Sequence, residues 1–128
     1  MTKNRAIDWL NQAQNDLKWA REGVKSRFYS QVCFMAQQAA EKAIKSIAYF
    51  KEYEIRGHSI AIIAKEIGIN GEVENAGKNL DIYYISSRYP DALPGGAPFE
   101  LFTERQAKEA LDFAELIINK AIDELGRD

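Results

Sequence analysis

Residues 28–50 read FYSQVCFMAQQAAEKAIKSIAYF, and their apolar side chains recur every three or four positions. That spacing places the side chains on one face of an α-helix. The face expected to pack into a core consists of Phe28, Val32, Met35, Ala36, Ala39, Ala43, Ile47 and Phe50. Because its alanines are small, we expect neighbouring helices to approach this helix closely.

Two further long helices are expected on either side of this segment. Residues 3–22 place an apolar stripe on a helix that Gly23 is expected to end. Near the other end of the chain, Thr103 and Gln106 have the spacing of a capping box, in which each side chain satisfies a backbone amide of the other residue. The last helix therefore begins at this box, and its apolar stripe continues almost to the C-terminus.

Two shorter helices are expected before that last helix. Ser59 is a suitable N-cap for a helix over residues 60–67. Another apolar pattern covers residues 72–85, where Gly77 weakens the helix by about 1 kcal/mol relative to alanine. Three long and two short amphipathic helices, without strand-like alternation, predict an all-α, antiparallel bundle of about five helices that forms one domain over residues 1–128.

The composition is that of a soluble globular protein. The chain has 128 residues, 46% of them hydrophobic and 28% charged, and no apolar run approaches the roughly 18 residues of a membrane span. No signal-peptide pattern follows Met1, so we expect a cytoplasmic protein that does not enter membranes. A single histidine and a single cysteine exclude a zinc cluster, and no cofactor is expected. A net charge of -2 argues against nucleic-acid binding by the whole surface and leaves room only for a local basic patch.

The connection over residues 86–102 holds every proline of the chain, Pro90, Pro94 and Pro98. A connection of more than about 12 residues without secondary structure is usually functional or disordered. Within it, Arg88 offers a planar fork for a phosphate or carboxylate, and Tyr89 offers a face on which a base can stack. A structural interpretation stands beside this one, in which Asp91 bonds nearby amides and Arg88 pairs with a buried acid.

The polar side of the second helix brings Gln38, Glu41 and Lys45 together, with Phe34 among them. One interpretation is a solvated face with an ion pair that contributes a few tenths of a kcal/mol. The other is an interface, either with a second copy of the chain or with the proline-bearing connection. Trp19 lies off the apolar stripe of the first helix in the same way, so both aromatic residues are candidate interface residues.

His58 is the only histidine of the chain, and it stands just before the expected third helix. A single histidine in this position is more often a packing or hydrogen-bonding residue than a catalyst. Alternatively, His58 and Arg56 contact a phosphate at the N-terminus of that helix, where the helix dipole is positive.

Three segments follow one another along the chain: QQAAEKAIK at residues 37–45, HSI at 58–60 and YISSRYPD at 84–91. Together they resemble the HEPN domain family, named for nucleotide binding in higher eukaryotes and prokaryotes. The resemblance implies a bundle of about five helices, frequent homodimers and, in prokaryotes, frequent pairing with a small separate nucleotidyltransferase. Such pairs often behave as toxin and antitoxin, with the HEPN protein acting as a metal-independent ribonuclease.

The ribonuclease signature of that family is absent from this sequence. Active members carry an arginine and a histidine with about four to six residues between them. Counted from Arg88, the histidine would fall at residues 93–95, none of which is histidine; counted back from His58, the arginine would fall at residues 51–53, none of which is arginine. Without an imidazole beside the arginine, acid–base cleavage at neutral pH lacks its usual agent, so no catalytic residue is assigned.

The residues and the resemblance together predict a noncatalytic binding module. It would be a homodimer that binds a nucleotide or RNA and works with a nucleotidyltransferase partner in a toxin–antitoxin-like pair. Its expected ligand-binding residues are Arg88, Tyr89, Asp91, Gln38, Glu41, Lys45 and His58. One alternative is a ribonuclease toxin with a displaced active site that uses His58 as a spatial neighbour. Two others are a purely structural dimerisation domain and a chain whose Tyr83, Tyr84 or Tyr89 is modified by the transferase.

Overall fold

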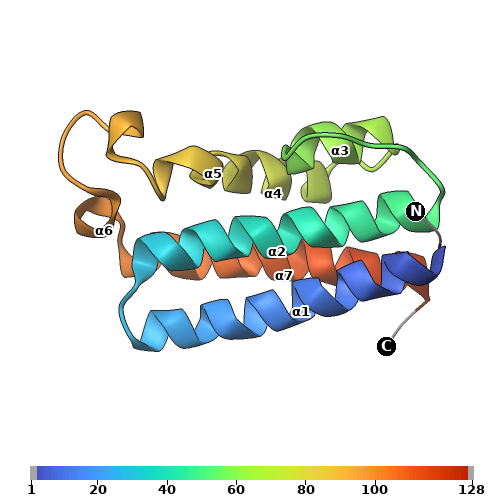
Figure 1. Ribbon diagram of the computed structural model, residues 1–128, viewed down its shortest axis with the longest axis horizontal. Coiled ribbons are helices and arrows are strands. Elements are labelled where there is room, and N and C mark those ends of the chain that lie inside the picture. The colour runs from blue at the N-terminus through green and yellow to red at the C-terminus, as the bar shows by residue number, and fades with distance from the viewer. Residues whose placement is uncertain (1–2, 127–128) are drawn as a thin grey trace.

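Three long helices, α1 (Lys3–Lys25), α2 (Tyr29–Phe50) and α7 (Glu104–Leu125), form the body of the structure (Figure 1). The computed structural model describes residues 3–126, and these residues contain helices but no strand. α1 runs antiparallel to α2, whereas α7 runs in the same direction as α2 (Figure 1). A further pass of the chain must therefore lead back from the end of α2 to the start of α7.

That return pass is a row of shorter helices, α3 (Ile60–Glu66), α4 (Glu72–Asp81) and α5 (Tyr83–Ser86), which lies along α2 (Figure 1). The predicted fourth helix is split at Ile82, although this residue keeps helical torsion angles of φ -56° and ψ -33°. Because the four passes alternate in direction along the chain, the predicted all-α antiparallel bundle is confirmed.

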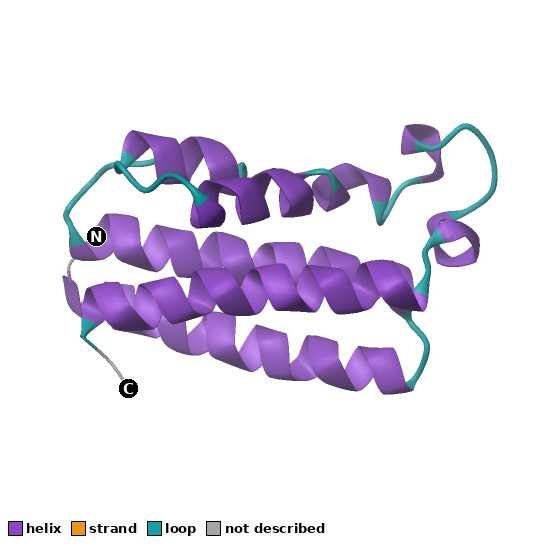
Figure 2. Cartoon of the chain, turned by 180° about the vertical axis from the view of Figure 1, so that it is seen from behind, coloured by secondary structure: helices purple, strands orange, loops and turns teal. Residues whose placement is uncertain are grey.

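Two of the three prolines in the 86–102 connection begin single helical turns. The fixed φ of proline suits the first turn of a helix, where its missing N–H would have no partner. Pro90 accordingly begins η1 (Pro90–Ala92), a 3-10 turn, and Pro98 begins α6 (Pro98–Leu101). Figure 2 shows the loop between these two turns projecting at one end of the molecule. The connection predicted to lack secondary structure therefore contains two short turns.

Two details of the first hairpin of helices differ from the prediction. α1 continues past Gly23 to Lys25 instead of ending at the glycine. Gly23 instead allows α2 to approach, since a Cβ there would lie 2.7 Å from Cγ2 of Val32. Phe28, which was expected in the core face, is the N-cap of α2 and is 56% exposed. The alanine-rich face of α2 is buried as predicted.

α2 is the central helix of the bundle, because it packs against all the other α-helices from α1 to α7. As a result, 13 of its 22 residues are buried, including the polar Gln37 and Glu41. The polar side of α2 was expected to face away from the core, and this expectation is wrong for Glu41. The α3–α5 row covers that side, since these short helices have apolar faces of their own to bury.

None of the helices within residues 3–126 combines the length and the apolar character needed to cross a membrane.

Candidate functional site

Glu41 is a buried carboxylate on α2 whose side chain is only 7% exposed. Its Oε2 accepts a hydrogen bond from Nζ of Lys45 at 2.8 Å and lies 3.1 Å from Nδ1 of His58. Its Oε1 accepts longer hydrogen bonds, both 3.4 Å, from Nε2 of Gln37 and of Gln38. A buried charge requires partners of this kind, and here an ammonium, an imidazole and two amides supply them.

His58 is held from three sides. An ionised carboxylate only accepts hydrogen bonds, so the contact with Glu41 assigns the proton to Nδ1 of His58 and leaves Nε2 without a role in that bond. The backbone carbonyl of His58 accepts a hydrogen bond from Nε2 of Gln37 at 3.1 Å. The imidazole stacks on the ring of Tyr84, with a centroid distance of 4.8 Å and an interplanar angle of 15°. The side chain is nevertheless 56% exposed, so solvent or a ligand can reach it.

Arg88 is held by the backbone and by aromatic rings. Its Nε and Nη2 donate to the carbonyl oxygen of Tyr84, one turn earlier, at 2.9 and 2.7 Å. Its guanidinium carbon lies 4.2 Å from the ring centroid of Phe34, 4.9 Å from that of Tyr84 and 4.8 Å from that of Tyr89. No carboxylate among residues 3–126 forms an ion pair with Arg88, so the interpretation that this arginine pairs with a buried acid is wrong.

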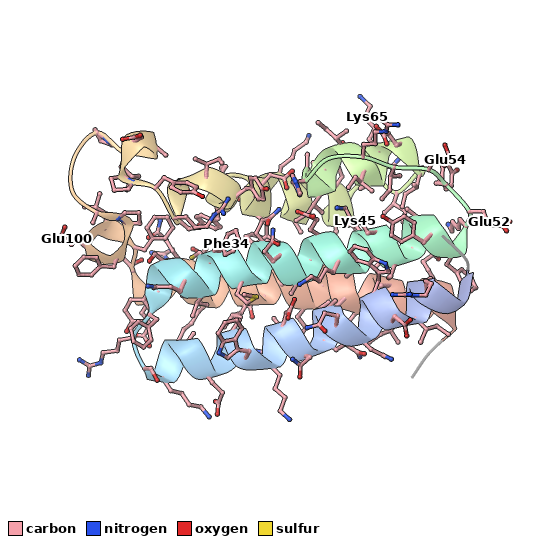
Figure 3. All side chains as sticks on the ribbon, viewed as in Figure 1. Phe34, Lys45, Glu52, Glu54, Lys65 and Glu100 are labelled. Carbon is pink, nitrogen blue, oxygen red and sulfur yellow. The ribbon has the colours of Figure 1, made fainter. Side chains whose placement is uncertain are left out.

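Tyr84 joins these two groups into one cluster, which we call the Arg88–Tyr84–His58 cluster. The imidazole and the guanidinium each lie within 5 Å of the same phenol ring. Figure 3 shows Phe34 and Lys45 projecting from the side of α2 that faces the α3–α5 row. The cluster and the Glu41 network are therefore continuous, because His58 belongs to both. The result is a half-exposed surface with two cationic or protonatable groups and an exposed aromatic neighbour, Tyr89.

Six of the seven predicted ligand-binding residues belong to this connected set: Gln38, Glu41, Lys45, His58, Arg88 and Tyr89. The seventh, Asp91, is exposed on η1, and no hydrogen bond or ion pair within the described part of the chain joins it to the others.

The N-terminus of α3 is already occupied by a carboxylate. Asp81 accepts hydrogen bonds from the backbone amides of Ile60 at 2.8 Å and Ala61 at 3.1 Å, and from the hydroxyl of Ser59 at 2.7 Å. Ser59 in turn caps the helix as predicted. The expectation that Arg56 and His58 hold a phosphate at this helix end is therefore wrong, because Asp81 takes the amides that such a phosphate would use.

The two predicted interface residues lie in one groove. Phe34 is half-buried beneath Arg88, and Trp19 is 65% exposed. Both line a groove of about 880 Å³ between the α1–α2 hairpin and the 86–102 connection. Of the two partners considered for Phe34, the structure therefore brings the connection into contact with it.

Sequence reasoning missed Gln37 and underrated Tyr84. Gln37 was counted among the motif residues but not the site residues, although it holds both Glu41 and the backbone of His58. Tyr84 was counted among the motif residues and the candidates for modification but not among the site residues, although its ring contacts both His58 and Arg88. Its spacing of four residues from Arg88 was the available clue, since residues so spaced are neighbours on a helix.

Among the described residues, neither a reactive thiol nor a cluster able to hold a metal ion adds to this site. Burial raises the pKa of Cys33 to about 12, so this thiol is not a nucleophile near neutral pH. Within residues 3–126, no group of three histidine, cysteine, aspartate or glutamate residues is placed to hold a metal ion.

Known proteins resemble this chain over nearly its whole length. A family model described as HEPN domain matches residues 6–125. Among solved structures, TT1696 from Thermus thermophilus has a TM-score of 0.89 and 38% sequence identity, covering 94% of this chain and 98% of its own. ST0689, an archaeal HEPN homologue, has a TM-score of 0.84 at 38% identity and covers 94% and 97%. "Putative toxin MJ1304" from Methanocaldococcus jannaschii is 24% identical over 123 residues, which are 86% of this chain and 81% of the relative.

Proposed function

The chain belongs to the HEPN domain family, and on this premise we propose that it binds a nucleotide or a segment of RNA through a phosphate, without cleaving it. The observation that supports the proposal is the guanidinium of Arg88, which is fixed by Tyr84 and surrounded by aromatic rings but paired with no carboxylate among residues 3–126. A positive charge held in this way favours an anionic ligand, and arginine is well suited to phosphate because its donors are planar and fixed in direction.

The neighbouring groups fit the same ligand. Because Nδ1 of His58 is engaged by Glu41, Nε2 is left for the ligand: it accepts a hydrogen bond from a sugar hydroxyl when the imidazole is neutral, and donates one to a phosphate oxygen when both nitrogens carry protons. The exposed ring of Tyr89 offers a stacking face beside Arg88. Glu41, Gln38 and Lys45 would then position His58 rather than touch the ligand, because Glu41 and Lys45 are almost enclosed.

Calorimetric titration with nucleoside monophosphates and with short single-stranded RNA tests this proposal. The change Arg88→Ala is expected to weaken binding about tenfold or more, because a charge-assisted contact contributes about 1.5–3 kcal/mol. The matched control is Lys65→Ala, which also removes one positive charge but at an exposed position on α3, away from Phe34 (Figure 3). Absence of binding to the unsubstituted protein would reject the proposal.

A second candidate function, phosphodiester cleavage, is favoured by one observation. A carboxylate that orients Nδ1 of a histidine while Nε2 stays accessible is an arrangement suited to general acid–base catalysis. Arg88 lies on the same tyrosine ring and would stabilise charge on the phosphate. RNA cleavage by the pure protein that disappears in both His58→Ala and Arg88→Ala would establish this ribonuclease; intact RNA would leave the binding function.

We further propose that the chain works in a toxin–antitoxin-like pair with a nucleotidyltransferase. The support is the likeness to a relative named as a putative toxin, together with the family membership. Co-expression with a neighbouring transferase gene, if the genome has one, is expected to yield a complex that survives purification. A transferase that elutes separately at all concentrations would contradict this pairing.

A further inference from the structure

The groove beside Arg88 has two walls from distant parts of the chain. One wall is formed by Trp19 of α1, Phe28 of the turn between α1 and α2, and Phe34 of α2. The other wall is formed by Arg88, Pro98 and Phe99 of the 86–102 connection. Its volume of about 880 Å³ lies within the range of roughly 300–1,000 Å³ that is usual for small-molecule sites. α6, which carries Pro98 and Phe99, lies beside the start of α2 at one end of the bundle (Figure 1).

The walls are apolar and aromatic, and their aromatic side chains are unusually exposed. Trp19 is 65% exposed and Phe99 71% exposed, from opposite walls. Large apolar side chains gathered on a concave surface favour an occupant with flat apolar faces. Within the described structure, Arg88 is the one charged residue that lines the groove, so charge complementarity requires that the same occupant carry an anionic group at this end.

Arg88 has donors left for that group. Of its five N–H groups, the contacts with the carbonyl of Tyr84 use one on Nε and one on Nη2, and a long contact of 3.4 Å with the hydroxyl of Tyr89 uses one on Nη1. One N–H on each Nη nitrogen is therefore without a partner among residues 3–126. Two donors on adjacent nitrogens can hold two oxygens of one phosphate.

We propose that this groove is a base-binding subsite, in which an unpaired nucleobase lies between the two aromatic walls while its phosphate binds Arg88. The inference rests on the proposed nucleotide or RNA binding and assigns the position of the base to this groove. Both a mononucleotide and a single strand present this base–phosphate unit. A base in a duplex cannot enter, because its faces are covered by its neighbours, so the groove selects single strands.

Tryptophan fluorescence provides a direct test, since the chain has two tryptophans. The change Trp9→Phe keeps an aromatic ring against Tyr49 and leaves Trp19 as the only reporter. Nucleoside monophosphates and a short single-stranded RNA are expected to quench Trp19, whereas ribose 5-phosphate and duplex RNA are expected to leave it unchanged. The ligand with the higher affinity, the mononucleotide or the single-stranded RNA, is the form that the groove prefers.

Substitutions then separate the base subsite from the phosphate contact. Trp19→Ala and Phe99→Ala are expected to weaken nucleotide binding roughly tenfold, the usual effect of removing one stacking ring, with ribose 5-phosphate affinity unchanged. Both side chains are exposed, so the fold is expected to tolerate their loss. The control is Tyr53→Ala, which removes an exposed aromatic ring outside the groove.

The outcomes that overturn the inference are distinct from those that overturn the proposed function. Nucleotide binding that depends on Arg88 but not on Trp19 or Phe99 rejects the base subsite and keeps the proposed function. Absence of binding by every ligand rejects both. If Trp19→Ala instead converts a dimer into a monomer, the groove belongs to a second copy of the chain and the base subsite is rejected.

Discussion

Glu41 shows how much of this protein depends on a single buried charge. Its carboxylate meets Lys45, His58 and two glutamine amides, and so connects the middle of α2 to the segment before α3. Removing a carboxylate from such a network leaves the ammonium of Lys45, whose side chain is only 12% exposed, without its counter-ion. The residue therefore supports both stability and the position of His58.

We predict that Glu41→Ala lowers the free energy of unfolding by about 3 kcal/mol, because it breaks a buried ion pair. Urea denaturation followed by circular dichroism measures the change. The control is Glu54→Ala, an exposed carboxylate expected to change stability by no more than about 0.5 kcal/mol. Equal stability of the two variants would show that the Glu41 network contributes little.

At the scale of elements, Gly77 shows that packing can reverse a local preference. In a helix, alanine is favoured over glycine by about 1 kcal/mol, which predicts that Gly77→Ala stabilises α4. In the structure, however, a Cβ at Gly77 would lie 2.8 Å from Cγ2 of Ile60 and 3.0 Å from the backbone nitrogen of Ala61. The glycine is therefore what lets α4 approach the start of α3.

We predict that Gly77→Ala destabilises the protein by up to about 2 kcal/mol, since overpacking costs about 1–3 kcal/mol and exceeds the gain in helix propensity. Thermal and urea unfolding both report the change. Gly95→Ala is the matched control, because no atom lies within 4 Å of the Cβ it would add. A more stable Gly77→Ala protein would mean that α3 moves aside at little cost.

Asp81 ties the end of α4 to the start of α3, since it accepts the first two amides of α3 and the hydroxyl of Ser59. We predict that Asp81→Ala lowers the free energy of unfolding by about 1–2 kcal/mol, the usual effect of losing a helix cap together with a favourable charge at the N-terminus. Asp91→Ala, which removes an exposed aspartate from η1, serves as the comparison in the same urea titration. If both variants unfold at the same urea concentration, the contacts of Asp81 with the start of α3 do not stabilise the protein.

At the scale of the whole molecule, the self-association expected from the sequence stays a prediction. We expect light scattering to give twice the 14.5 kDa mass of one chain. The reason is the number of large apolar side chains that remain exposed outside the groove, among them Ile62 on α3 and Ile82 between α4 and α5. A single species of 14.5 kDa at all concentrations would contradict the dimer.

Much of the fold was predictable, because helical periodicity is a local property. The long helices, the Thr103 capping box and the Ser59 cap are all found where the sequence placed them, and the family resemblance is confirmed over residues 6–125. The candidate site was predictable only in part. Arg88 and His58 were both selected, and the spacing of four residues places Tyr84 beside Arg88, but nothing local indicated that Tyr84 also lies against His58.

The amino-acid sequence by itself determines the all-α class, the helix boundaries to within a few residues, and which segments carry the polar residues. Each of these depends on residues that are close together in the chain. Which polar groups are buried and which share a surface was decided only by the tertiary structure. Glu41 became a buried network centre because the α3–α5 row packs over α2, and the groove formed because the 86–102 connection comes back against the α1–α2 hairpin. Such contacts join segments that are far apart in sequence, so no periodicity within one segment could have predicted them.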